Sequence, residues 1–112
     1  MPPLAQEACE ACTGSTPVMA GDDLEELRAE LDAGWELSED RRSIRRTLRF
    51  RDFAEAFAYA VRVAFIAEAE EHHPDITVGW GRCTVVLTTH AVHGLTRNDF
   101  IVAAKVDRIT AG

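Results

Sequence analysis

The spacing of apolar residues predicts an amphipathic helix in the first third of the chain. Leu24, Leu27 and Leu31 recur on one helical face. Asp22 precedes them and can accept a hydrogen bond from a free N–H group at the start of a helix. Gly34 follows and tolerates the left-handed conformation in which helices commonly end. The pattern therefore predicts a helix that begins at Asp22 and is ended by Gly34.

A longer helix is predicted over residues 52–70. Asp52 gives the same start signal, and Pro74 opposes continuation because the residue before a proline avoids the α conformation. The predicted buried face consists of Phe53, Phe57, Ala60, Val61, Ala64 and Phe65. Glu68 lies four residues after Ala64 on the same stripe, so its carboxylate is predicted to need a partner rather than to face bulk solvent.

Alternating polar and apolar residues predict two pairs of strands. Residues 35–37 and 43–50 flank the polar turn SEDR, and residues 76–80 and 84–90 flank a bend at the sequence GWG. Thr96 and Asp99 then have the spacing of a capping box, so a last helix is predicted to run to about residue 109.

The order helix, two strands, helix, two strands, helix predicts an α+β fold. Short links between successive strands imply hairpins, so we expect a two-layer sandwich in which a four-stranded antiparallel sheet carries three helices on one face. Residues 1–21 contain three of the four prolines and show no apolar period, which predicts a flexible N-terminal lead-in. Residues 22–112 are predicted to form the one domain.

Composition argues against several classes of protein. The net charge of −7 disfavours non-specific binding of nucleic acid, and no run reaches the ~20 apolar residues that a membrane span requires. The N-terminal sequence lacks the basic and apolar regions of a secretory signal, and three cysteines are an odd number for a disulfide framework. We therefore expect a cytoplasmic protein with reduced thiols and with neither a membrane nor a nucleic acid as partner.

The histidines mark a candidate site. His72 lies four residues after Glu68, on the same face if the helix persists, which predicts a carboxylate–imidazole pair; a helix-end glutamate beside a histidine favoured by the helix dipole is the structural alternative. In extended geometry His73 points away from His72, so we expect one of the two in a pocket and the other as its brace. His90 ends a strand where the sheet meets a loop, a common place for functional residues, whereas His93 is expected to be an exposed loop histidine.

Other candidates leave alternatives open. The chain lacks the HxH, HExxH and paired CxxC spacings of metal sites, so no metal is predicted. Cys9 and Cys12 form a single CxxC, which fits either a solvated tail or a metal or redox role. Asp99 is predicted to cap the last helix and to help hold the shape of the site, and Trp35 to lie in the core or to form a flat pocket wall.

Arginines are concentrated in one predicted strand and its flanks. Six of the eleven fall there: Arg41, Arg42, Arg45, Arg46, Arg49 and Arg51. Such a strand is either a solvated edge that resists aggregation or a docking patch for an acidic partner.

An ordered set of residues resembles the signature of the pterin-4a-carbinolamine dehydratases, also called 4a-hydroxytetrahydrobiopterin dehydratases. The set is Glu68-x-x-x-His72-His73-Pro74, then Trp80, Thr89-His90, Gly94-Leu95 and Asp99. The similarity covers about residues 20–109, including Gly34-Trp35 and the closing NDFIVAAKVD. It implies the same α+β sandwich, assembled as a homodimer or as a homotetramer made of dimers.

The resemblance also implies an enzyme and the roles of its residues. Members remove water from a 4a-hydroxytetrahydropterin in tetrahydrobiopterin recycling, and they use neither a metal nor a cofactor. By the family pattern His72 and His90 are the proton-transfer pair, His73 contacts the pterin, Glu68 orients His72, and Trp35 and Asp99 flank and support the site. Imidazole suits proton transfer near neutral pH, since its unperturbed pKa is ~6.5.

The chain departs from the family pattern in the loop beside this presumed site. Thr88, Ala91 and His93 stand where many bacterial members have tryptophan, lysine and glycine. The family also includes proteins encoded with carboxysomes that assist RuBisCO assembly without dehydratase activity. The resemblance therefore implies a dehydratase first, and a RuBisCO assembly factor as the alternative.

Overall fold

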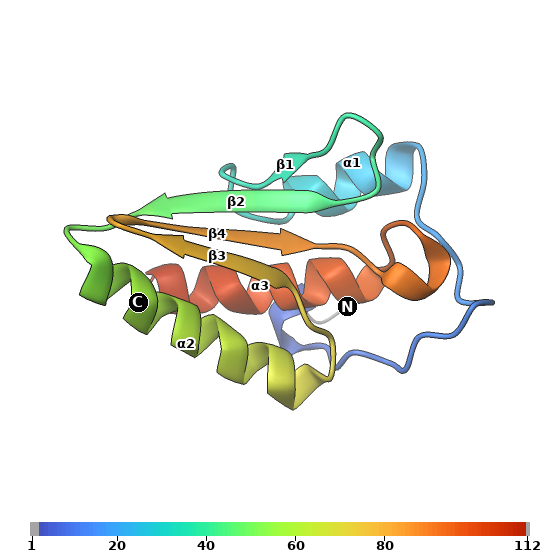
Figure 1. Cartoon of the computed structure of the whole chain (residues 1–112). Coiled ribbons are helices and arrows are strands. Elements are labelled where there is room, and N and C mark those ends of the chain that lie inside the picture. The colour runs from blue at the N-terminus through green and yellow to red at the C-terminus, as the bar shows by residue number, and fades with distance from the viewer. Residues whose placement is uncertain (1–2, 112) are drawn as a thin grey trace.

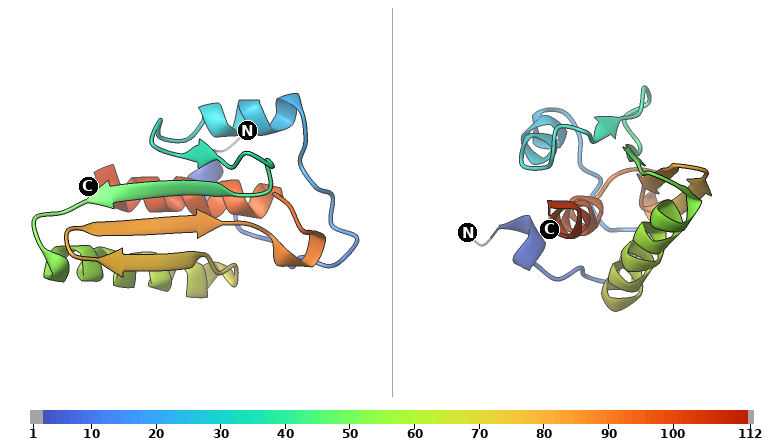
Figure 2. Two further views of the ribbon diagram at one scale, coloured as in Figure 1. Left: turned by 45° about the horizontal axis from the view of Figure 1, so that its top comes forward. Right: turned by 90° about the vertical axis from the view of Figure 1, so that its left-hand side faces the viewer.

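A computed structural model describes residues 3–111. The elements in chain order are a short 3₁₀ helix η1 (Leu4–Gln6), α1 (Asp22–Ala29), β1 (Glu36–Leu37), β2 (Ile44–Arg49), α2 (Phe53–Glu70), β3 (Asp75–Gly79), β4 (Arg82–Leu87), a second 3₁₀ helix η2 (His90–Val92) and α3 (Arg97–Ala111). The strands form one antiparallel sheet in the order β1-β2-β4-β3, and the three α-helices lie on one side of it (Figures 1 and 2). The predicted α+β sandwich is confirmed. No helix in this part of the chain is both long enough and apolar enough to cross a bilayer.

Local signals explain where the elements begin and end. Asp52 caps α2, because its side chain accepts a hydrogen bond from the backbone N–H of Glu55 at 2.8 Å. Helix α1 begins at Asp22 as predicted, but its N-cap is Gly21, with φ +59°, and no side chain caps it. It ends at Ala29, before the predicted stop at Gly34, and residues 30–34 form an irregular connection with turns at Glu30 and at Ala33–Gly34.

The GWG sequence forms the tight turn between β3 and β4. Gly79 pairs with Arg82 in the ladder, which leaves Trp80 and Gly81 as the turn residues. Gly81 has φ +69°, a conformation that glycine adopts at little cost. The bend predicted from the glycines is therefore a hairpin turn.

The core lies between the inner face of the sheet, α3 and α1. Its largest fully buried side chains include Trp35, Phe100, Leu24, Ile44, Leu87 and Leu95. The three leucines predicted for the first helical stripe are all buried. Helix α3 supplies five further buried apolar residues, so it is the central helix of the domain: Ile101, Val102, Ala103, Ala104 and Val106.

The predicted buried face of α2 is largely wrong. Phe53, Phe57, Val61 and Phe65 are 49%, 51%, 40% and 72% exposed, and Ala64 is exposed as well. The face that packs on the rest of the protein consists of Ala56, Tyr59, Ala60, Val63 and Ala67, of which only Ala60 was expected. The physical reason is that α2 is apolar on both faces, and its face with small residues packs against the protein.

Part of the segment expected to be a flexible lead-in, residues 4–12, makes contacts with the rest of the domain. Leu4 is 3% exposed and belongs to the core. Arg97 donates two hydrogen bonds to the Glu7 carboxylate, at 2.9 and 2.7 Å, and the backbone N–H of Cys9 donates to Glu70 Oε1 at 2.9 Å. These long-range contacts fix residues 4–12, which we call the N-terminal strap, across the ends of α2 and α3; residues 1 and 2 lie outside the described part of the chain.

Candidate functional site

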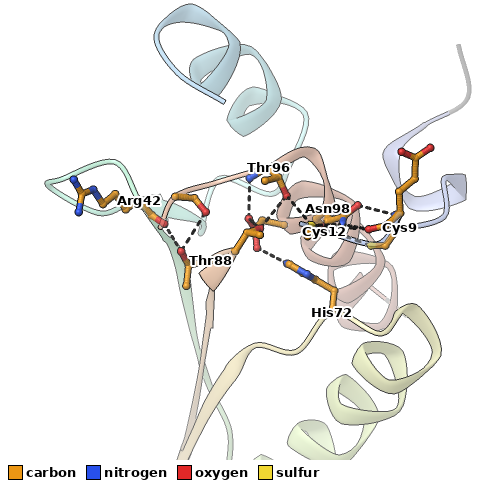
Figure 3. Close-up of polar contacts among 11 residues, drawn as sticks. Cys9, Cys12, Arg42, His72, Thr88, Thr96 and Asn98 are labelled. Atoms are coloured by element: carbon orange, nitrogen blue, oxygen red, sulfur yellow. Dashed lines mark hydrogen bonds and ion pairs between the residues drawn. The ribbon is translucent and has the colours of Figure 1, made fainter. Parts of the chain in front are cut away.

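His72 lies against the start of α3. Helix α2 ends at Glu70, and its C-cap, Glu71, adopts the left-handed conformation with φ +54°. The chain therefore turns out of the helix axis, and the His72 ring reaches Asp99, with 2.6 Å between His72 Nε2 and Asp99 Oδ1 (Figure 3). The His72 side chain is 11% exposed and that of Asp99 is fully buried.

The second carboxylate oxygen of Asp99, Oδ2, is also hydrogen-bonded within the protein. Asp99 Oδ2 accepts hydrogen bonds from the Thr96 backbone N–H at 3.0 Å and from the Thr89 hydroxyl at 2.7 Å. The hydroxyls of Thr89 and Thr96 also lie 2.9 Å apart. Asp99 is thus the third residue of α3 in the predicted capping arrangement, and its charge lies at the positive end of the helix dipole. The same carboxylate caps the helix and fixes the His72 ring.

Glu68 pairs with His73 and not with His72, so the expected orientation of His72 by Glu68 is wrong. Glu68 Oε1 lies 2.7 Å from His73 Nε2, and both side chains are largely exposed, at 75% and 60%. The physical reason is the left-handed C-cap at Glu71, which prevents His72 from occupying the next turn of α2. Adjacent histidines therefore face two different carboxylates.

The two remaining histidines follow β4. His90 is exposed and begins η2, directly after Thr89, whose hydroxyl belongs to the Asp99 network. His93 is exposed with φ +53° and lines a hollow of about 330 Å³ together with Val18 and Arg41. The structure thus brings His72, Asp99 and the segment that carries His90 together, and it places His93 in a hollow that these residues do not line.

Trp35 lies in the core and away from these histidines. Its side chain is 1% exposed, and its indole N–H donates to Asp107 Oδ1 at 2.8 Å. Asp107 also accepts from Arg46 at 2.6 Å. It follows Asp99 by eight residues on α3, which corresponds to about 12 Å along the helix. The core interpretation of Trp35 holds, and the pocket-wall interpretation does not fit this position.

Sequence inspection missed the strap as a neighbour of the site. Asn98, next to Asp99, donates to the Glu10 carbonyl at 2.6 Å and to Cys12 Sγ at 3.0 Å (Figure 3). Burial raises the pKa of the Cys9 thiol to about 12, and the nearby Glu70 carboxylate adds to the effect. The CxxC spacing was visible in the sequence, but nothing in it indicated contact with α3.

The arrangement suits proton transfer. A histidine whose Nε2 donates to a carboxylate keeps its Nδ1 lone pair available as a proton acceptor. His72 with Asp99 and His73 with Glu68 both have this form. Within residues 3–111, no three histidine, cysteine or acidic side chains gather in a way that could hold a metal ion.

Solved structures with the same fold support this description. A transcriptional coactivator/pterin dehydratase from Brucella melitensis aligns with a TM-score of 0.77 and 32% identity, over 83% of this chain and 98% of that one. A pterin dehydratase-like protein described as a RuBisCO assembly factor in the alpha-carboxysome aligns with a TM-score of 0.60 and 20% identity, over 70% and 92%. The second likeness concerns the fold alone.

Sequence comparison defines the family. A protein of Rubrobacter xylanophilus named "Putative pterin-4-alpha-carbinolamine dehydratase" is 46% identical over 109 residues, which is 97% of this chain and 100% of that protein. A protein of the same name from Legionella pneumophila (strain Corby) is 42% identical over 106 residues, 95% of this chain and 94% of that one. The model of the family Pterin 4 alpha carbinolamine dehydratase matches residues 17–109. The chain therefore belongs to the pterin 4 alpha carbinolamine dehydratase family.

Proposed function

We propose that this protein dehydrates a 4a-hydroxytetrahydropterin to the quinonoid dihydropterin, in the cytoplasm and without a cofactor. Membership of the family supports the reaction class. The observation that carries the proposal is the 2.6 Å contact between His72 Nε2 and the buried Asp99 carboxylate. It supplies an oriented imidazole at the position where the family pattern requires a proton-transfer group.

The reaction requires one proton to be removed and one to be delivered. The C4a–O bond breaks and the hydroxyl leaves as water, so its oxygen needs a proton. A ring N–H of the pterin loses its proton as the new C=N bond forms, so a base must accept it. The net change is the loss of one water molecule, with no oxidation or reduction. Each positioned acid or base typically contributes ~10²–10⁴-fold.

The positions of the histidines suggest a division of roles. His72 accepts the ring proton at Nδ1, because Asp99 holds its Nε2. His90 is exposed beside Thr89 and delivers the proton to the leaving oxygen. His73, turned by Glu68, contacts the pterin and helps to hold it. Asp99 is a positioning residue in this scheme, since its oxygens are occupied by protein groups.

Stopped-flow decay of 4a-hydroxytetrahydropterin, with and without the protein, tests the proposal. We expect strong acceleration that falls by at least 10²-fold in His72→Ala and in His90→Ala. His93→Ala is the matched control, because this histidine is exposed and lines a hollow that His72 and His90 do not line, and it should keep the wild-type rate. Absence of acceleration by the folded wild-type protein, or full activity of both alanine variants, refutes the proposed function.

We also propose that copies of the chain associate through α2. Ten residues of α2 are exposed, and eight are apolar: Phe53, Ala54, Phe57, Ala58, Val61, Ala64, Phe65 and Ala69. The other two, Arg62 and Glu68, have opposite charges. In an antiparallel pair with its two-fold axis near Phe65, Arg62 of one copy lies level with Glu68 of the second copy. Exposed apolar faces of this kind are typical of association sites.

RuBisCO assembly is the second candidate function. It is favoured by the unusual loop residues Thr88, Ala91 and His93, which depart from the pattern of many bacterial dehydratases next to His90. Under this alternative the folded protein gives no acceleration in the stopped-flow assay and raises the yield of soluble RuBisCO on co-expression. Acceleration that depends on His72 rejects the assembly role as a replacement for catalysis.

A further inference from the structure

One face of the sheet carries arginines, and no helix of residues 3–111 covers it. In the left view of Figure 2 the strands lie in front of the helices, which cover the far face of the sheet. Side chains alternate between the two faces of each strand, so the residues opposite the core residues Ile44, Cys83 and Val85 point away from the helices. These outward residues are Arg45, Thr47 and Arg49 on β2, Arg82, Thr84 and Val86 on β4, and Asp75, Thr77 and Gly79 on β3.

Two of these arginines are direct cross-strand neighbours. Arg49 pairs with Arg82 in the β2–β4 register, and both are exposed. The guanidinium of Arg82 lies across Gly79 of β3, where a Cβ atom would come within 2.6 Å of its Nη1. Like charges placed directly opposite each other disfavour the sheet, so this pair is unfavourable in the isolated protein.

Four other arginines of residues 3–111 form ion pairs with carboxylates: Arg41, Arg46, Arg51 and Arg97. Arg46, on the inner face of β2, pairs with Asp107, and Arg97 pairs with Glu7. For Arg45, Arg49 and Arg82, which we call the arginine face, no carboxylate lies within ion-pair distance among residues 3–111. In a chain with nineteen acidic residues, these three guanidiniums keep their donors free.

We propose that the arginine face docks an acidic polypeptide segment of a partner protein. Carboxylates of that segment pair with Arg49 and Arg82, since guanidinium matches a carboxylate through two parallel hydrogen bonds. Arg45 lies four residues from Arg49 on β2, about 13 Å away, so it pairs with a second carboxylate of an extended segment four residues further on. The Thr47 and Thr84 hydroxyls, 2.8 Å apart between the arginines, offer further polar contacts.

Charge favours a polypeptide over a nucleic acid as the occupant. The chain as a whole carries −7, which repels a long polyanion. The arginine face is bordered by Glu36 of β1, opposite Arg45, and by Asp75 of β3, opposite Val86. A short acidic segment can place its carboxylates on the three arginines and avoid these two acids, whereas a continuous row of phosphates cannot.

Fluorescence anisotropy with defined probes tests the proposal on the full chain. The probe is a fluorescein-labelled 16-residue peptide that alternates glutamate and alanine, and the control probe replaces glutamate by glutamine. We expect saturable binding of the glutamate peptide in 20 mM salt. Affinity should fall at least tenfold in the double variant Arg49→Gln/Arg82→Gln and severalfold in Gly79→Ala, which displaces the Arg82 guanidinium without removing a charge. Arg108→Gln, an exposed arginine of α3, is the matched control and should bind as the wild type does.

Each outcome of this experiment either supports or overturns the docking of an acidic segment on the arginine face. Binding of the glutamate peptide that is lost in the double variant and retained in Arg108→Gln supports the arginine face. Equal losses in the double variant and in Arg108→Gln show general charge attraction and overturn the proposal, as do equal affinities for the glutamine peptide. If a 16-nucleotide single-stranded DNA binds more tightly than the glutamate peptide, the ligand of the arginine face is a nucleic acid and the proposal is overturned. If the glutamate peptide does not bind in 20 mM salt, the proposed docking site is rejected. Dehydration rates of the double variant stay at the wild-type value, which separates this test from that of the proposed function.

Discussion

His72 and Asp99 are 27 residues apart in the sequence and 2.6 Å apart at Nε2 and Oδ1. Their contact joins the end of α2 to the first turn of α3. Asp99 contributes both to stability and to the proposed chemistry. It caps α3 by accepting from the Thr96 backbone N–H, accepts a further hydrogen bond from Thr89, and orients His72. Substitutions here must therefore be assessed for stability and for rate separately.

Asp99→Asn should separate the tautomer of His72 from the cap of α3. The amide can still accept from Thr96 and Thr89, but its N–H₂ donates to His72 Nε2 and so moves the ring proton to Nδ1. We expect kcat to fall on the order of 10²-fold or more, with a loss of about 1 kcal/mol in the free energy of unfolding. Stopped-flow kinetics and urea unfolding measure the two effects. Asp107→Asn, two turns along α3, is the control: it should lower stability and leave kcat unchanged, and a full rate in Asp99→Asn contradicts the role of His72 as base.

Glu68→Gln should affect substrate binding more than turnover. Glu68 contacts His73, and both side chains are more than half exposed, so their pair contributes at most about 0.5 kcal/mol to stability. We expect KM to rise severalfold with kcat near the wild-type value, since His73 is proposed to hold the pterin. The same KM in His73→Ala, with no further change in the double variant, would show that the two residues act together. A fall in kcat as large as that of His72→Ala would show instead that Glu68 acts on the proton-transfer step.

Phe57→Asp and Phe65→Asp should dissociate the proposed assembly. The two rings are 51% and 72% exposed, so their loss removes little from the core of the single chain. We expect sedimentation velocity to show an oligomer for the wild-type protein and a monomer for these variants, with unchanged helical circular dichroism. Val18→Asp, at another exposed apolar residue, is the control and should keep the oligomer. A wild-type monomer at micromolar concentration refutes association through α2.

Cys9 should react slowly with alkylating agents in the native protein. Burial, helped by the Glu70 carboxylate, raises the pKa of its thiol from 9.0 to about 12. At pH 8 the native thiolate population is therefore far smaller than in the unfolded chain, and iodoacetamide labelling should be at least tenfold slower than in urea, as read by mass spectrometry. Because the native pKa is raised, this group favours folding below pH 9 and loses that contribution as the pH rises towards 12. Equal labelling rates in both states would show that the strap is detached in solution.

The contact between Glu7 and Arg97 should make the strap sensitive to acid. The hydrogen bonds from Arg97 hold the pKa of Glu7 below its ordinary value of 4.5. A lowered pKa means that the pair stabilises the fold fully above pH 4.5 and is lost as the pH falls through the lowered value. At pH 7, Glu7→Gln should cost about 0.5–1 kcal/mol in the free energy of unfolding, and this difference should shrink as the pH falls below 4.5. Glu39→Gln serves as the control for loss of one exposed charge, and a pH-independent cost in Glu7→Gln would contradict the ion pair.

Order and type of the elements could be predicted because each is encoded locally. The leucine spacing of α1, the Asp52 cap of α2 and the Thr96–Asp99 box of α3 act within one or two turns. Alternation and short links were sufficient to predict the hairpins. That His72 and His90 share one site stays a prediction, which rests on the family resemblance and not on the periodicity.

What could not be predicted depends on packing between distant segments. Helix α2 has apolar residues on both faces, so periodicity could not decide which face meets the rest of the protein; small residues such as Ala56 and Ala60 are buried while Phe65 is exposed. The strap has few apolar residues, and it is held by side chains far along the chain, such as Glu70 and Asn98. Glu68 contacts His73 because the backbone of Glu71 is left-handed. A glutamate at this position does not indicate that conformation, so the sequence could not predict the contact.

The left-handed backbone of Glu71, with φ +54°, sets the direction in which the His72 side chain leaves the end of α2. A left-handed backbone strains most residues and suits glycine, so Glu71→Gly should preserve the aim of His72 while a β-branched residue should spoil it. The proposed catalyst therefore depends on the backbone of a residue outside the set of proton-transfer groups, and engineering of this protein should leave that dihedral unchanged.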